Sequence, residues 1–120
     1  MTAGPDRRLT RERRLRRKAE IDRVFRRGRS ASDALLRVHA LTSGGPDSRV
    51  GISCPRKLGS SVARNRWKRL IREAFRLNRE GLGSGLDLVI VPLRPPAGLK
   101  RQDVEKSLVG IVTQLKRRMR

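Results

Sequence analysis

The stretch "RVGISCPRKLGSSVARNRWKRLIREAFR", residues 49–76, decides the fold because two structural periods meet in it. Residues 49–54 alternate as a strand does, with one side apolar: Val50, Ile52 and Cys54. From about 62 to 79 the apolar residues recur at helical spacing, and Ser60 or Ser61 can cap the helix. The helical stripe consists of Trp67, Leu70, Ile71, Ala74 and Phe75. A strand, a loop and a long amphipathic helix therefore follow one another.

Working outward, the same patterns predict elements on both sides of this stretch. In chain order they are a helix over 18–28 ending at Gly28, a short strand near 29–31, strands over 34–42 and 49–54, a helix over 62–79, a buried central strand over 86–93 and a helix over 103–119. The order α-β-β-β-α-β-α is typical of an α+β fold. We expect a basic flexible arm over 1–14, a single domain over 15–120, and an antiparallel hairpin between the strands 34–42 and 49–54.

The charge balance points to a polyanionic partner. The chain has 31 Lys+Arg against 11 Asp+Glu, a formal net charge of +20. Nucleic acid or an anionic membrane surface would offset the resulting self-repulsion. No apolar run is long enough for a transmembrane helix, and the N-terminus lacks the apolar core of a secretory signal. Cys54 is the only cysteine, so we expect no internal disulfide and a cytoplasmic location.

Several kinds of enzyme site are disfavoured by the residue inventory. One cysteine and one histidine, His39, cannot build a zinc site, and Cys54 fits a small core residue. The acids are scattered, whereas two-metal nucleases need them clustered. The glycines of "GLGSGLD" follow a helix and precede a strand, the reverse of a phosphate-binding loop. We therefore expect no catalytic residues and no metal site from the protein alone.

The helix over 62–79 carries concentrated positive charge beside one nearby acid, Glu73. An ordinary solvated helix face mixes charges of both signs. Arginine dominates here, and its planar fork matches phosphate. The surrounding strands disfavour a helix-turn-helix, and the strands lack the aromatics of a stacking platform, so structured RNA is the favoured ligand. The candidate RNA-binding residues are Arg64, Asn65, Arg66, Lys68, Arg69 and Arg72.

The stretch 49–76 closely resembles the signature of the bacterial ribonuclease P protein family. The shared motifs are Arg-Asn-Arg (64–66), Lys-Arg (68–69) and Arg-Glu-Ala-Phe (72–75), and "LRRKAEIDRVFRRGR" (15–29) resembles the first helix of that family. The resemblance extends from about 15 to 119. It implies an α-β sandwich with a four-stranded central sheet and a left-handed β-α-β crossover, although right-handed crossovers are the general rule.

The resemblance also implies a function. Ribonuclease P removes the 5′ leader from precursor tRNA by endonucleolytic cleavage, its catalytic subunit is an RNA, and Mg²⁺ is held mainly by that RNA and the substrate. The basic helix would face the ribonuclease P RNA, with one protein per RNA, in the cytoplasm and without a membrane. A cleft between the first helix and the sheet would bind the leader. Its residues here would be Ile21, Phe25, Leu36, Arg37, His39, Arg56 and Lys57.

Two features of this sequence depart from the family pattern. Ile21 stands where a second phenylalanine is common, and His39 stands where a tyrosine is common. Apolar packing and charge would then replace part of the stacking on the leader. Two other functions remain open from the residues alone: a ribosomal or general structured-RNA-binding protein, and a protein nuclease that acts without RNA.

Overall fold

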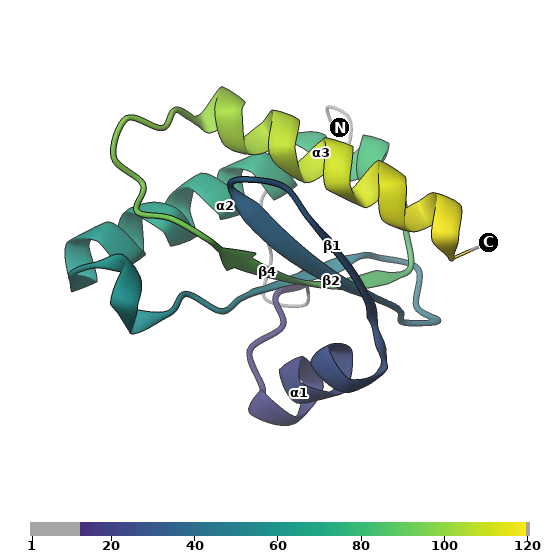
Figure 1. Ribbon diagram of the computed structural model, residues 1–120. Coiled ribbons are helices and arrows are strands. Elements are labelled where there is room, and N and C mark those ends of the chain that lie inside the picture. The colour runs from purple at the N-terminus through teal and green to yellow at the C-terminus, as the bar shows by residue number, and fades with distance from the viewer. Residues whose placement is uncertain (1–12, 120) are drawn as a thin grey trace, which may run out of the picture.

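The computed structural model describes residues 13–119, which form three helices and a four-stranded sheet (Figure 1). The chain order α-β-β-β-α-β-α confirms the predicted α+β class. The elements are α1 Lys18–Arg27, β1 Arg29–Ser32, β2 Leu36–Thr42, β3 Arg49–Ile52, α2 Ser61–Leu82, β4 Leu86–Pro92 and α3 Arg101–Arg118, with a short 3-10 helix over Arg56–Leu58.

The sheet has the strand order β1-β2-β4-β3. β2 is antiparallel to β1 and to β4, whereas β3 is parallel to β4. The predicted hairpin between the strands at 34–42 and 49–54 is therefore wrong, because β4 lies between them. Apart from Asp87, β4 is apolar on both faces, and all its residues except Val91 are buried, so a central position removes the most apolar surface from water.

The connection from β2 to β3 crosses the start of β4 rather than forming a tight turn. Ser48 in this connection is buried; its Oγ donates to the carbonyl of Gly83 at 2.8 Å and accepts from the amide of Leu86 at 3.1 Å. The amide of Ser43 donates to the carbonyl of Gly85 at 2.8 Å. These bonds hold the chain across the end of the strand that separates β2 from β3.

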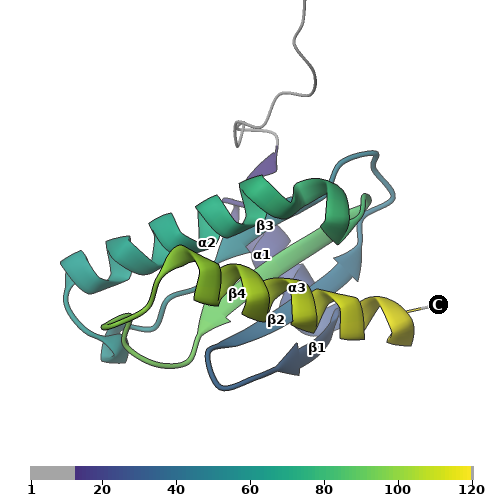
Figure 2. The same ribbon diagram turned by 90° about the horizontal axis from the view of Figure 1, so that it is seen from above.

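The crossover from β3 through α2 to β4 is left-handed. Figure 2 views the sheet from the side that α2 and α3 cover. When that view is turned so that β3 and β4 point upward, α2 lies in front of the sheet and β4 lies to the left of β3. The expectation from the family resemblance is confirmed on this point, against the general preference for right-handed crossovers.

The larger core lies between the sheet and the two helices α2 and α3. Its largest buried side chain is Trp67, whose indole N–H donates to the carbonyl of Arg94 at 2.8 Å. The predicted apolar stripe of α2 is buried except for Leu70, which is only partly buried. Strand residues Leu36, Val38, Leu88 and Ile90 face these helices in the same cluster, which also includes Leu108 and Leu115 of α3.

The smaller core lies on the opposite face of the sheet, between the sheet and α1 (Figure 1). It joins Val24 of α1 to Leu15 and Val89, with Ile21 packed against it. Gly28 ends α1 where the chain passes very close to β2. A Cβ there would lie 2.5 Å from the carbonyl oxygen of Val24 and 2.7 Å from that of Ala40, so only glycine fits.

An ion-pair network ties α1 to the sheet. Arg49 of β3 donates to both carboxylate oxygens of Asp87, its register partner on β4, at 2.9 and 2.8 Å. Its third nitrogen donates to Glu20 of α1 at 2.7 Å. The hydrogen bonds to Asp87 are the largest cause of a raised pKa for Arg49. Arg49 therefore fixes the position of α1 over the sheet.

Asp33 plays a similar role at the turn between β1 and β2. Its carboxylate accepts from the amides of Leu35 and Leu36 at 2.8 and 2.9 Å and from the hydroxyl of Ser107 on α3 at 2.6 Å. Burial raises the pKa of Asp33, but the hydrogen bonds together lower it by more than burial raises it, so the pKa lies below its ordinary value of 3.8.

The predicted basic arm over 1–14 falls almost wholly outside the described residues. Of its last two residues, Arg14 pairs with Val50 at the outer edge of β3, and the amide of Leu15 donates to the carbonyl of Val50 at 2.8 Å. Arg13 lies 3.7 Å from a carboxylate oxygen of Asp47. Both described residues of the predicted arm therefore contact the folded body.

Candidate nucleic-acid interface

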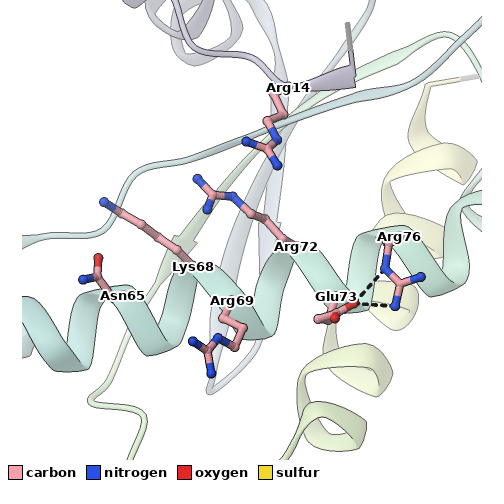
Figure 3. Close-up of a pocket in the computed structure, with 7 residues that line it drawn as sticks. All are labelled: Arg14, Asn65, Lys68, Arg69, Arg72, Glu73 and Arg76. Atoms are coloured by element: carbon pink, nitrogen blue, oxygen red, sulfur yellow. Dashed lines mark hydrogen bonds and ion pairs between the residues drawn. The ribbon is translucent and has the colours of Figure 1, made fainter. Parts of the chain in front are cut away.

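The outer side of α2 forms a hollow lined mostly by cations (Figure 3). The one acid among its described lining residues is Glu73, whose carboxylate already accepts from Arg76 at 2.8 and 2.7 Å. The lining residues are Arg14, Asn65, Lys68, Arg69, Arg72, Glu73 and Arg76. A phosphate entering this hollow would meet donors and no unpaired carboxylate.

Three of these cations have no acidic partner in the described chain. Lys68, Arg69 and Arg72 form no ion pair with any residue in 13–119. They stand on a helix that is anchored by Trp67, Ile71 and other buried residues, so their positions along the surface are fixed. Within residues 13–119, the positive charge of these three side chains is therefore not neutralised by any carboxylate.

The other two predicted arginines of α2, Arg64 and Arg66, do not line this hollow. Arg66 donates from Nη2 to the carbonyl of Leu99 at 2.9 Å, so it turns toward the start of α3. A second hollow lies there, lined by Val62, Asn65, Arg66, Arg69, Leu70, Leu99, Lys100 and Arg101. Arg64 is half-buried, and its Nη2 donates to the hydroxyl of Ser61 at 3.4 Å. The two hollows share Asn65 and Arg69, so the predicted RNA-binding residues of α2 other than Arg64 line two adjoining basic surfaces.

The opposite face of the sheet brings together three of the predicted leader-cleft residues. The rings of Phe25 and His39 meet edge to face, with centroids 4.6 Å apart and planes at 72°. Arg37 lies two residues before His39 on the same face of β2. Burial, and to a lesser degree the charge of Arg37, lower the pKa of His39 below 6.5. Phe25 remains 37% exposed, so this aromatic pair is open to a ligand.

The structure contradicts one of the predicted cleft residues, Leu36. Leu36 is fully buried and faces α2 and α3, because alternation along β2 sends it to the opposite side from Arg37 and His39. It cannot touch a leader. Ile21 is half-buried and serves mainly the smaller core.

The last two predicted cleft residues lie away from the aromatic pair. Arg56 and Lys57 are exposed on the short 3-10 helix between β3 and α2. Among the residues described, no hydrogen bond or ring contact joins them to Phe25 or His39.

Sequence reasoning missed Arg14, Lys100 and Arg101 as parts of the basic surfaces. Arg14 reaches the α2 hollow because residue 14 pairs with β3, a long-range contact with no local signal. Lys100 and Arg101 start α3, where the amide of Lys100 donates to Asp103 at 2.8 Å. A count of cations near predicted helix starts would have found this last pair.

The described residues do not suit a resident divalent cation. Mg²⁺ prefers oxygen ligands in octahedral geometry. The α2 hollow offers one carboxylate, and Arg76 occupies it. Within residues 13–119, no group of three or more His, Cys, Asp or Glu side chains converges. No helix in the same range is long and apolar enough to cross a membrane.

Comparison with known proteins identifies the family. A sequence model described as Ribonuclease P matches residues 9–116. The ribonuclease P protein component of Clostridium acetobutylicum is 40% identical over 102 residues, which cover 83% of this chain and 86% of that protein. The solved ribonuclease P protein of Thermotoga maritima is 31% identical, with a TM-score of 0.74 and coverage of 87% and 96% of the two chains. That of Staphylococcus aureus is 26% identical, with a TM-score of 0.75 and coverage of 87% and 95%. With this agreement in sequence and fold, the chain belongs to the ribonuclease P protein family.

Proposed function

We propose that this chain is the protein subunit of a ribonuclease P and binds the RNA subunit through the outer side of α2. The observation that carries this proposal is that Lys68, Arg69 and Arg72, on a helix anchored in the core, have no acidic partner among residues 13–119. An RNA backbone supplies the missing anions. Arg69 and Arg72 can each grip a phosphate bidentately, and Asn65 beside them can bond a sugar or base edge.

The opposite face of the sheet binds the 5′ leader of precursor tRNA. Phe25 offers a half-exposed ring for stacking on a base, and Arg37 offers a charge for the backbone. His39 packs edge to face against Phe25, and burial lowers the pKa of this histidine. In this proposal the leader contacts come from Phe25, Arg37 and His39, with Arg56 and Lys57 reaching more distant nucleotides.

In this proposal the RNA subunit, and not the protein, catalyses the cleavage of precursor tRNA. The RNA subunit and substrate hold the Mg²⁺ ions, since the described protein residues offer no fitting set of oxygen ligands. The protein raises the affinity for precursor tRNA and lowers the Mg²⁺ concentration that cleavage requires, because its cations reduce phosphate repulsion. One protein binds one RNA, and the complex works in the cytoplasm.

Reconstitution tests the proposal. Cleavage of precursor tRNA by the cognate RNA is measured at low Mg²⁺ with no protein, with the wild-type chain, with Arg69→Gln and with Arg117→Gln. Arg117 is exposed on α3, so its replacement removes the same charge away from both basic surfaces. We expect wild type and Arg117→Gln to raise kcat/KM strongly and Arg69→Gln to need a higher protein concentration.

Two outcomes would favour the alternative functions instead. If the chain binds ribosomal RNA fragments more tightly than the ribonuclease P RNA and leaves cleavage unchanged, it is a general RNA-binding protein. If purified protein free of RNA cuts the precursor, the protein itself is the nuclease.

A further inference from the structure

Arg14 and Arg72 come from distant parts of the sequence and point toward one another across the edge of the sheet (Figure 3). Arg14 is fixed by its pairing with Val50, and Arg72 is fixed by the buried side of α2. Lys68 lies one helical turn before Arg72 on the same side. Neither arginine forms an ion pair with a residue in 13–119. The fold therefore holds two like charges face to face.

This arrangement works against the free protein. Burial, and then the nearby charge of Arg14, lower the pKa of Arg72, which means that its charged form is disfavoured where it stands. Like charges facing each other are destabilising unless an anion lies between them. Two guanidiniums and an ammonium that converge from two elements form a preorganised binding site for a group with several acceptor oxygens.

The position of Arg14, Lys68 and Arg72 on the surface indicates which ligand they bind. They line two adjoining hollows: one runs along the outer side of α2, and the other runs past β3 to Ile21 at the start of α1. Arg14, Lys68 and Arg72 are shared by both hollows. An RNA backbone that runs from the face of the sheet under Phe25 and His39, where the leader is proposed to bind, to the outer side of α2 would pass these three cations.

We propose that Arg14, Lys68 and Arg72 grip a single RNA phosphodiester at the outer edge of β3, where the two RNA-binding faces of the protein meet. The inference rests on the proposed function and adds a residue, Arg14, from the segment before α1. One phosphate bound by both arginines bridges that segment to α2. The contact links the placement of α1, and with it Phe25, to engagement of α2.

A double-mutant cycle tests this assignment. The variants are Arg14→Gln, Arg72→Gln, the double variant and the control Arg117→Gln, each titrated with the ribonuclease P RNA at several salt concentrations. Each single variant in the pair should bind about 10–100-fold more weakly, the range for losing a hydrogen bond to a charged group. The double variant should bind within about threefold of the weaker single variant, because both residues serve one phosphate.

The salt dependence gives an independent count of phosphates. Losing one phosphate contact reduces the slope of log K against log salt by roughly 0.7–0.9. We expect that reduction in both single variants and no larger one in the double variant. Additive losses with a doubled slope change, or single variants that match Arg117→Gln, would overturn the proposal. Repeating the cycle with precursor tRNA on the assembled complex shows which RNA supplies the phosphate.

A measurement without RNA separates this inference from the proposed function. Inorganic phosphate, compared with chloride at equal ionic strength, should raise the unfolding midpoint of the wild type more than that of Arg14→Gln or Arg72→Gln. In chloride at low salt the two variants should be at least as stable as the wild type, because a repulsion is removed. Equal stabilisation of all three proteins by phosphate overturns the site, whereas failure of the wild type to bind the RNA overturns the proposed function.

Discussion

Replacing Asp87 by asparagine should strongly destabilise the fold, and replacing Glu20 by glutamine should do so only weakly. Both carboxylates accept from Arg49, but their surroundings differ. The side chain of Asp87 is 10% exposed and accepts two hydrogen bonds, whereas that of Glu20 is 34% exposed and accepts one. Comparing Asp87→Asn with Glu20→Gln therefore tests whether burial determines how much an ion pair contributes to stability.

The magnitudes follow from that difference. Breaking a buried pair by removing one partner costs about 3–5 kcal/mol. Arg49 is 30% exposed and asparagine keeps one acceptor oxygen, so about 2–4 kcal/mol is expected for Asp87→Asn. A partly exposed pair contributes about 0–1 kcal/mol, which bounds Glu20→Gln. With a urea slope of about 2 kcal/mol per M, the midpoints fall by roughly 1–2 M and by less than roughly 0.5 M.

Urea unfolding followed by the fluorescence of Trp67 measures these changes, since Trp67 is the sole tryptophan and is fully buried. Asp22→Asn is the matched control, because Asp22 is exposed on α1. We also expect Glu20→Gln to weaken the binding of precursor tRNA, since Glu20 helps to position α1. Equal losses of stability in Asp87→Asn and Glu20→Gln would refute the reasoning.

Three further predictions concern other described contacts. Arg66→Ala should lower the free energy of unfolding by about 0.5–1.5 kcal/mol through loss of a hydrogen bond to the loop before α3, whereas Arg69→Ala should leave it unchanged, as urea titrations can compare. Because the pKa of Asp33 is lower in the folded state than its ordinary value of 3.8, the ionised carboxylate stabilises the fold above pH 3.8, and this stabilisation is lost as pH falls through the folded-state pKa. Between about pH 5 and pH 3 the wild type should therefore lose more stability than Asp33→Asn. His39 should titrate below 6.5 by NMR, so that its contribution to stability is complete above 6.5 and declines as pH falls from there, and Arg37→Gln should move its pKa back upward.

The sequence predicted the elements well because their patterns are local. The apolar stripe of α2, the cap at Ser60 and the largely apolar run of β4 each follow from neighbouring residues, and the structure places them within a few positions of the expectation. The strand pairing was not predictable in the same way. Whether β3 pairs with β2 or β4 depends on which arrangement buries β4, a property of the whole sheet.

The candidate RNA-binding site was also predicted only where it depends on local sequence. Residues on one helix, such as Lys68 and Arg72, could be assigned to one side from their spacing, and the structure agrees. Leu36 was misassigned because the resemblance was carried along β2 without applying its alternation. Arg14 was missed because only the fold brings it to α2.

The affinity of the chain for the ribonuclease P RNA at 50 and 200 mM monovalent salt tests the central claim most directly. If the cations of α2 are completed by about 6–10 RNA phosphates, the affinity should fall by about 10³–10⁵ over that range. A fall of less than about tenfold, or an equal affinity for ribosomal RNA fragments at both salt concentrations, would contradict the account.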